Sequence, residues 1–267
     1  MRNFAWIFFY PLLIGGLIGV SPASVVAQEQ SKRPDRSALV VNEIVVKNLL
    51  NGGDRDVTFL AVIKMMVGHL LAADFAIERG DLAEARQHLT HPVAEVYPEI
   101  VSLLKERKLK EPSAARDRIL GALQSGAVEE TRTKIYDAIV EIEGWQHAID
   151  SKKMVMDRIV ADTAVLLMRT AVTKYEKAFK AGKTVNVVEY YEGSAFVTEA
   201  MTLIQDAEYE WKTRDPAAYE HLELSLQELQ TAWPSETTTQ NSHIQLSRLL
   251  ELVTTIEGQI NDIRNSD

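Results

Sequence analysis

The chain has 267 residues, with 29 Lys and Arg against 38 Asp and Glu, a net charge of −9 and no cysteine. The lack of cysteine excludes disulfides, thiolate metal sites, covalently attached c-type haem and cysteine nucleophiles. The negative charge repels nucleic acid and anionic lipid and attracts cations, so we expect no nucleic-acid partner.

The first residues are typical of a secretory leader. Arg2 precedes an apolar run at 4–20, and a stretch of small residues ends at Ala27. We therefore expect residues 1–27 to be removed as a signal peptide and 28–37 to form a mobile polar leader. The mature protein would be periplasmic or secreted. We expect that no second apolar run is long enough to cross a bilayer, and so no membrane span after cleavage.

Nearly all of the remaining chain has helical periodicity. Ala, Leu, Glu and Lys dominate, and no stretch shows sustained strand alternation. In chain order, the expected helices cover 38–50, 55–79, 82–107, 113–124, 127–149, 151–181, 184–213, 216–232 and 238–264. The sequence thus predicts an all-α protein, an up-and-down helical bundle over residues 38–267.

A weak internal repeat runs through this pattern. A long apolar helix, a glycine turn and a second helix occur at 55–107 and again near 151–213, with Gly80 and Gly182 at the two turns. A true duplication would make 38–125 and 126–267 two related sub-bundles packed together. Helical composition alone would also produce this match, so both interpretations stay open.

The turn at Gly80 carries clear stop and start signals. Gly80 follows an apolar helical run as a C-terminal stop, and Asp81 follows as an N-cap with Glu84 three residues later, a capping box. Antiparallel helices folded about Gly80 place His69 opposite residue 92, within about one turn of His88 and His91.

This hairpin predicts a metal site. His69 lies on a helix that is apolar almost all round, so we expect the helix to be central and His69 to be buried. His88, His91 and Glu95 share one strip of the next helix, where Pro92 either starts a new helix or kinks a continuous one.

Neutral imidazoles and a carboxylate suit iron, zinc or copper(II), so the expected metal ligands are His69, His88, His91 and Glu95. The alternative is a core histidine at 69 with solvated histidines at 88 and 91. Two interpretations are also open for Glu189, Glu192 and Glu199, which share a strip of a later helix. A charged, solvated flank is the favoured interpretation there, and completion of a metal site is the other.

Other chemistry has little support. The sequence has no G-x-S-x-G elbow and no glycine-rich phosphate loop, so we expect no enzyme. His147, His221 and His243 each stand alone, and we expect them at the surface.

The exported, cysteine-free helical pattern, together with Gly68-His69 and the nearby His88, His91 and Glu95, resembles the imelysin-like proteins of bacterial iron uptake. That family's motif is glycine, any residue, histidine, two residues, glutamate. Here Gly68 directly precedes His69 and Ala72 stands at the glutamate position, so no ligand is carried over. The resemblance implies handling of iron or another metal in the periplasm.

The sequence therefore predicts an exported helical bundle that binds a transition-metal ion through its histidines. The rival hypothesis is a non-catalytic interaction or adaptor protein without a metal, with an envelope protein as its partner.

Overall fold

The structure is a computed structural model. It describes residues 53–109, 113–124, 127–149, 153–234 and 244–266. The expected signal peptide at 1–27, the leader at 28–37 and the helix at 38–50 lie outside these ranges.

The described part of the chain is almost entirely helical, which confirms the all-α prediction. Helical elements follow one another in the order α2 (Arg55–Glu78), α3 (Leu82–His91), the π-helix η1 (Pro92–Val96), α4 (Tyr97–Glu106), α5 (Ser113–Gln124), α6 (Val128–Gly144), the 3₁₀ helix η2 (Trp145–Ala148), α7 (Lys153–Ala178), α8 (Val187–Asp206), α9 (Glu208–Arg214), α10 (Pro216–Gln230) and α11 (Leu246–Asn265).

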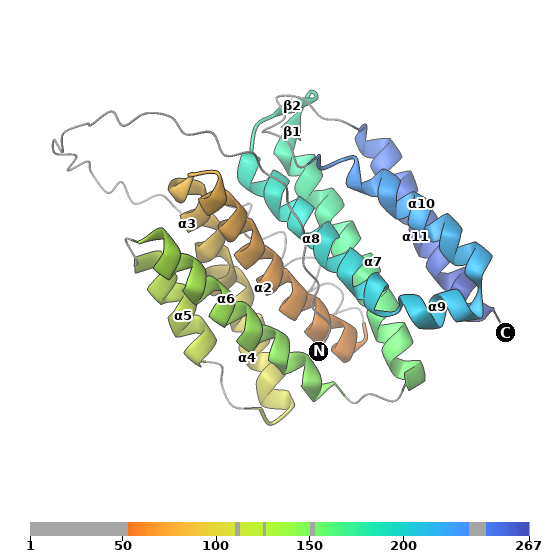
Figure 1. The fold of residues 1–267 in the computed structure, drawn as a ribbon, viewed down its shortest axis with the longest axis horizontal. Coiled ribbons are helices and arrows are strands. Elements are labelled where there is room, and N and C mark those ends of the chain that lie inside the picture. The colour runs from red at the N-terminus through yellow and green to blue at the C-terminus, as the bar shows by residue number, and fades with distance from the viewer. Residues whose placement is uncertain (1–52, 110–112, 125–126, 150–152, 235–243, 267) are drawn as a thin grey trace. The chain divides into compact units, whose positions relative to one another are not determined.

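The helices form two groups that meet along α2 (Figure 1). One group contains α2, the α3–η1–α4 helix, α5 and α6, and the other contains α7, α8, α10 and α11. Within each group, consecutive helices pack as antiparallel hairpins, the arrangement expected of an up-and-down bundle. The internal repeat stays a prediction, although both groups begin with a long helix followed by a glycine turn.

α2 is the central helix, as its all-round apolar sequence predicts. It packs against α3, α6, α7 and α8, and most of its side chains are buried. By length and composition it could also cross a membrane, with 89% of its most apolar window buried inside the protein. The expectation that no later apolar run reaches such a length is therefore wrong, because a helix covered on every side in a bundle core needs the same apolar composition.

Side-chain caps and glycines set the helix ends. The Asp54 carboxylate accepts hydrogen bonds from the amides of Asp56 and Val57 at the start of α2. Asp81 Oδ1 accepts from the Glu84 amide at 2.9 Å, which confirms the N-cap half of the expected capping box. Gly80, with φ of 79°, supplies the left-handed residue that ends the preceding helix.

The chain departs from the expected helices at several places: α8 and α9 divide the expected helix 184–213, and α6 passes into the 3₁₀ helix η2. The turn around Gly182 (φ 74°) contains a small antiparallel hairpin of β1 (Phe179–Lys180) and β2 (Lys183–Thr184), so the helices on either side are shorter than predicted. α8 then begins after Asn186, whose side chain accepts from the Glu189 amide. Side-chain capping outweighs helical periodicity at such an end.

Pro92 does not end its helix. The chain continues through the π-helical turn η1, where the Tyr97 amide donates to the Pro92 carbonyl five residues earlier. Proline has no amide proton, so the regular hydrogen bond to the preceding turn is missing at this position. The structure therefore supports the kinked, continuous alternative. π-Helical turns of this kind are frequent at functional sites.

Candidate metal centre

The polar residues of α2 each meet a different part of the bundle. Lys64 Nζ lies 3.2 Å from Glu199 of α8 and 3.4 Å from Glu143 of α6. Asp74 accepts two hydrogen bonds from Arg132 of α6. His69 lies between these two positions along α2 and is completely buried.

The helical hairpin brings His69 to the predicted histidines. The ring centroids of His69 and His91 are 5.7 Å apart, with the rings perpendicular. This contact confirms the pairing expected from a fold about Gly80. His69 also packs edge-on against the ring of Phe196 on α8, with the centroids 5.2 Å apart.

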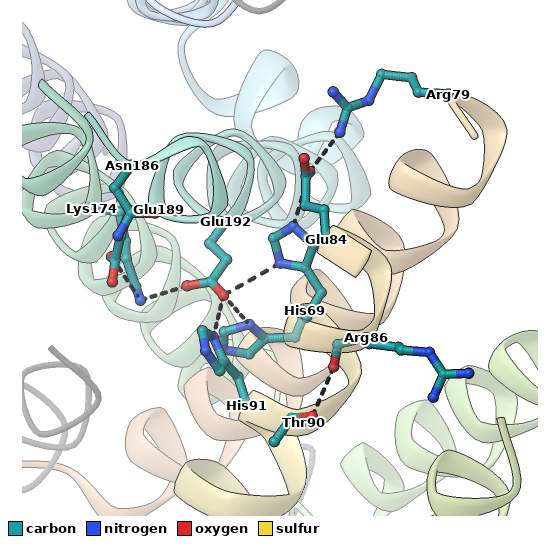
Figure 2. Close-up of polar contacts among 11 residues, drawn as sticks. His69, Arg79, Glu84, Arg86, Thr90, His91, Lys174, Asn186, Glu189 and Glu192 are labelled. Carbon is teal, nitrogen blue, oxygen red and sulfur yellow. Dashed lines mark hydrogen bonds and ion pairs between the residues drawn. The ribbon is translucent and has the colours of Figure 1, made fainter. Parts of the chain in front are cut away.

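The Glu192 carboxylate of α8 is the centre of the cluster (Figure 2). Its Oε1 atom lies 3.2 Å from His69 Nδ1, 3.4 Å from His88 Nδ1 and 2.5 Å from His91 Nδ1. Potential ligand atoms of His69, His91 and Glu192 all lie within 4.8 Å of one another. Two imidazoles and one carboxylate thus converge on one point.

The favoured interpretation of the α8 carboxylates as a solvated flank is wrong. Glu189, Glu192 and Glu199 are all buried, because α8 packs against both α2 and α7. One sequence signal pointed to this arrangement: Lys64 and His69 lie on the apolar helix α2, so a buried lysine needs an opposite charge and a buried histidine needs a polar partner. Spacing along the sequence could not show which carboxylates supply it.

Lys174 of α7 holds the other oxygen of Glu192. Its Nζ atom donates to Glu192 Oε2 at 2.5 Å and lies 3.0 Å from Glu189 Oε2. Burial by itself would lower the pKa of Lys174, but the two carboxylates raise it above its ordinary value. The lysine is therefore a charged ammonium inside the bundle.

His88 lies beside the three converging residues, between two carboxylates. Its Nδ1 faces Glu192, and its Nε2 lies 3.4 Å from Glu84 Oε1. Glu84 in turn accepts a hydrogen bond from Arg79 at 2.5 Å. Burial alone would lower the pKa of His88, but Glu192 and Glu84 raise it. A histidine that keeps its proton supports the carboxylates by hydrogen bonding instead of offering a lone pair.

The fourth predicted ligand, Glu95, lies in the π-helical turn, and its side chain falls outside the described part of the structure. Of the isolated histidines, His147 and His221 are exposed as expected. His243 lies outside the described residues.

Burial and neighbouring charges set the protonation states of His69 and Glu192. It lowers the pKa of His69 to about 4, so its imidazole is neutral at physiological pH. Burial would raise the pKa of Glu192, but Lys174 and the neighbouring His69 hold it well below its ordinary value. A neutral imidazole and an ionised carboxylate are the protonation states that a metal requires.

The residues present fit a metal ion. Both ring nitrogens of His69 are buried and make no hydrogen bond within the described structure. Two ligand atoms about 2.1 Å from a shared ion lie roughly 3.0–3.4 Å apart, and the His69 Nδ1–Glu192 Oε1 distance of 3.2 Å falls in this range. His91 Nδ1 is hydrogen-bonded to the same oxygen at 2.5 Å, so the His91 ring would have to move away from Glu192 to share an ion with it. The His91 side chain is 25% exposed, whereas His69 and Glu192 are inaccessible, so an ion would enter past His91.

Part of the chain is similar to a known protein family. Residues 154–267 match the family model of the iron permease-associated 4-helix bundle domain. The matched segment contains Lys174, Glu189 and Glu192, while His69 and His91 precede it. No curated protein and no solved structure matches the chain. The matched segment is less than half of the chain. The match supports a relation to iron uptake, as the imelysin-like resemblance implied, but it does not support the imelysin-like family specifically.

Proposed function

We propose that this protein is an exported helical bundle that binds iron as cargo at His69, His91 and Glu192. One observation carries the proposal: the buried ring nitrogens of His69 make no hydrogen bond to any residue that the structure describes, and Nδ1 lies 3.2 Å from a buried carboxylate oxygen. An unsatisfied ring in a core costs about 1–3 kcal/mol, and a bound metal would remove this cost.

The donor set favours iron. Two histidines and one carboxylate with further positions open are typical of non-haem Fe(II) sites. The name of the matching domain family also links its members to iron permeases. Zinc accepts the same donors, and copper(II) accepts imidazoles, so both belong in the test.

The proposed location is the periplasm, and the proposed partner is a membrane-embedded iron permease. The leader-like residues 1–27 support export, and the family name supports the partner. The proposed role is binding and delivery of the ion, which the family name of the matching domain supports. Cell fractionation and N-terminal sequencing of the mature protein would test export, with Gln28 as the expected first residue.

Metal binding itself is tested on the untagged mature protein. Fe(II) under anaerobic conditions, Zn(II) and Cu(II) are titrated separately into the wild type and into His69→Ala, His91→Ala and Glu192→Gln. The exposed His147→Ala and His221→Ala variants are matched controls for the loss of a histidine. Circular dichroism establishes that each variant is folded.

We expect about one ion per chain in the wild type and in both controls, with affinity at least tenfold weaker in the three site variants. A given set of donors normally binds Fe(II) more weakly than Zn(II) and Cu(II). Fe(II) binding that is tighter than this order predicts would support iron as the cargo. Equal, substoichiometric metal in every sample would overturn the proposal.

A second candidate is the adaptor protein without a metal. Lys174 favours it, because its ammonium already compensates the charge of Glu192 at 2.5 Å. The cluster would then be a buried ion-pair network that orients α2, α7 and α8. In that case the site variants would lose stability and no sample would bind metal.

A further inference from the structure

The two oxygens of Glu192 have different partners. Oε1 faces the imidazoles of His69, His88 and His91, and Oε2 accepts from Lys174. A metal shared by His69 and His91 would approach Oε1. The same carboxylate would therefore face both the proposed ion and a buried ammonium. Figure 2 shows Glu192 between Lys174 on one side and the rings of His69 and His91 on the other.

Lys174 has a second carboxylate within reach. Glu189 lies one helical turn before Glu192 on α8, and its Oε2 atom is 3.0 Å from Lys174 Nζ. This oxygen is buried and makes no hydrogen bond of good geometry among the described residues. A small rotation about the lysine side chain would strengthen the contact to Glu189 while weakening the contact to Glu192.

The charges of the cluster show why such a movement matters. Without metal, one ammonium faces two buried carboxylates, and these would be very costly to bury without it. With a divalent ion, the same ammonium adds repulsion close to the metal. Lys174 thus stabilises the metal-free protein and opposes the loaded one.

We propose that Lys174 is a built-in counter-ion that competes with the metal for Glu192, and that Glu189 receives it when the metal binds. This inference rests on the proposed metal-binding function and deepens it. The consequence is a site of restrained affinity, suited to cargo that must be released. The rival explanation is a purely structural ion pair, in which Lys174 orients Glu192 and so improves metal binding.

The test is metal affinity in variants of Lys174 and Glu189. Lys174→Met removes the ammonium and keeps an unbranched side chain. Lys174→Arg keeps the charge. The double variant Lys174→Met/Glu189→Gln removes one charge of each sign, which protects the fold if the single methionine variant fails to fold. Zn(II) and anaerobic Fe(II) are titrated against a competing chelator.

We expect Lys174→Met to bind metal at least about tenfold tighter than the wild type, the scale of effects from groups that contact metal ligands. Lys174→Arg should remain near the wild-type affinity, and the double variant should also bind more tightly because Oε2 is freed. Without metal, Lys174→Met should melt at a lower temperature than the wild type, and metal should raise its melting temperature by a larger amount.

Unchanged or weaker binding in both methionine variants would overturn the inference, while the metal-binding function would stand. A wild type that binds neither ion would instead overturn the proposed function. The two failures are therefore distinguishable in one set of titrations.

Discussion

The ring of Phe196 fills the space that a side chain at Gly68 would need. A Cβ atom at Gly68 would lie 2.8 Å from Phe196 Cδ1, closer than real Cβ contacts allow. The same ring packs edge-on against His69, the residue after Gly68. The missing side chain on α2 thus allows α8 to approach, and that approach brings Glu192 to His69.

Replacing Gly68 with alanine should therefore disturb both packing and the site. We expect a loss of about 1–3 kcal/mol in the free energy of unfolding, because added volume in a packed core forces side chains to move. Metal affinity should fall with it. Chemical denaturation and metal titration measure the two effects.

Gly258→Ala is the matched control, because it lies within α11 and a Cβ there would meet nothing within 4 Å. Alanine in a helix interior is favoured over glycine by about 0.5–1 kcal/mol, so this variant should gain stability. A Gly68→Ala protein as stable as Gly258→Ala would contradict the tight contact with Phe196.

The histidines of α3 should differ in their effect on metal binding. His91 belongs to the group whose ligand atoms converge, whereas His88 lies between Glu192 and Glu84. We expect His91→Ala to weaken binding strongly and His88→Asn to weaken it by a smaller factor. Titration of the two variants under identical conditions decides this, and equal losses would restore His88 as a ligand, as the sequence had indicated.

Replacing Arg132 with alanine should lower the free energy of unfolding. Its guanidinium donates to both oxygens of the buried Asp74, at 2.7 and 3.0 Å, and joins α6 to α2. Breaking a buried pair leaves an uncompensated charge and costs about 3–5 kcal/mol, although partial exposure of Arg132 places this case near the lower end. Urea unfolding of Arg132→Ala gives the value.

Arg248→Ala provides the comparison. Arg248 also contacts both oxygens of a glutamate, Glu228, but both side chains are about half exposed. Exposed pairs contribute about 0–1 kcal/mol. Similar losses of unfolding free energy in the two variants would show that the burial of Asp74 does not increase the contribution of its ion pair to stability.

The start of α2 should be sensitive to acid. Burial would raise the pKa of Asp54, but the Arg158 guanidinium and the amides of Asp56 and Val57 lower it below its ordinary value of 3.8. The ionised form is therefore favoured in the folded state. The ionised Asp54 carboxylate therefore stabilises the fold above pH 3.8, and this stabilisation is lost as the pH falls through the lowered pKa.

Asp54→Ala should lose about 1 kcal/mol at pH 7, the usual value of an N-cap, and the difference from the wild type should shrink below pH 3.8. Asp54→Asn should retain most of the cap while losing the ion pair with Arg158. Denaturation at several pH values measures both. A difference that stays constant down to pH 2 would rule out the ionised carboxylate as its source.

Much of the fold follows from local patterns. The α5 helix at 113–124 and the turn at Gly80 come from periodicity, capping and a left-handed glycine, all of which act between residues close in sequence. The short hairpin around Gly182 escaped prediction because its strands are only two residues long. Periodicity carries no signal over so short a stretch.

The meeting of His69 and His91 followed from the sequence, because one tight turn joins the two helices that carry them and so sets their relative height. The position of Glu192 did not follow, although Glu192 shares a strip of its helix with Glu189 and Glu199. It lies 123 positions after His69, and its burial depends on α8 packing against α2 and α7. Periodicity can show that a carboxylate shares a helix face, but only the packing of distant helices decides whether that face meets water, a lysine or a pair of imidazoles.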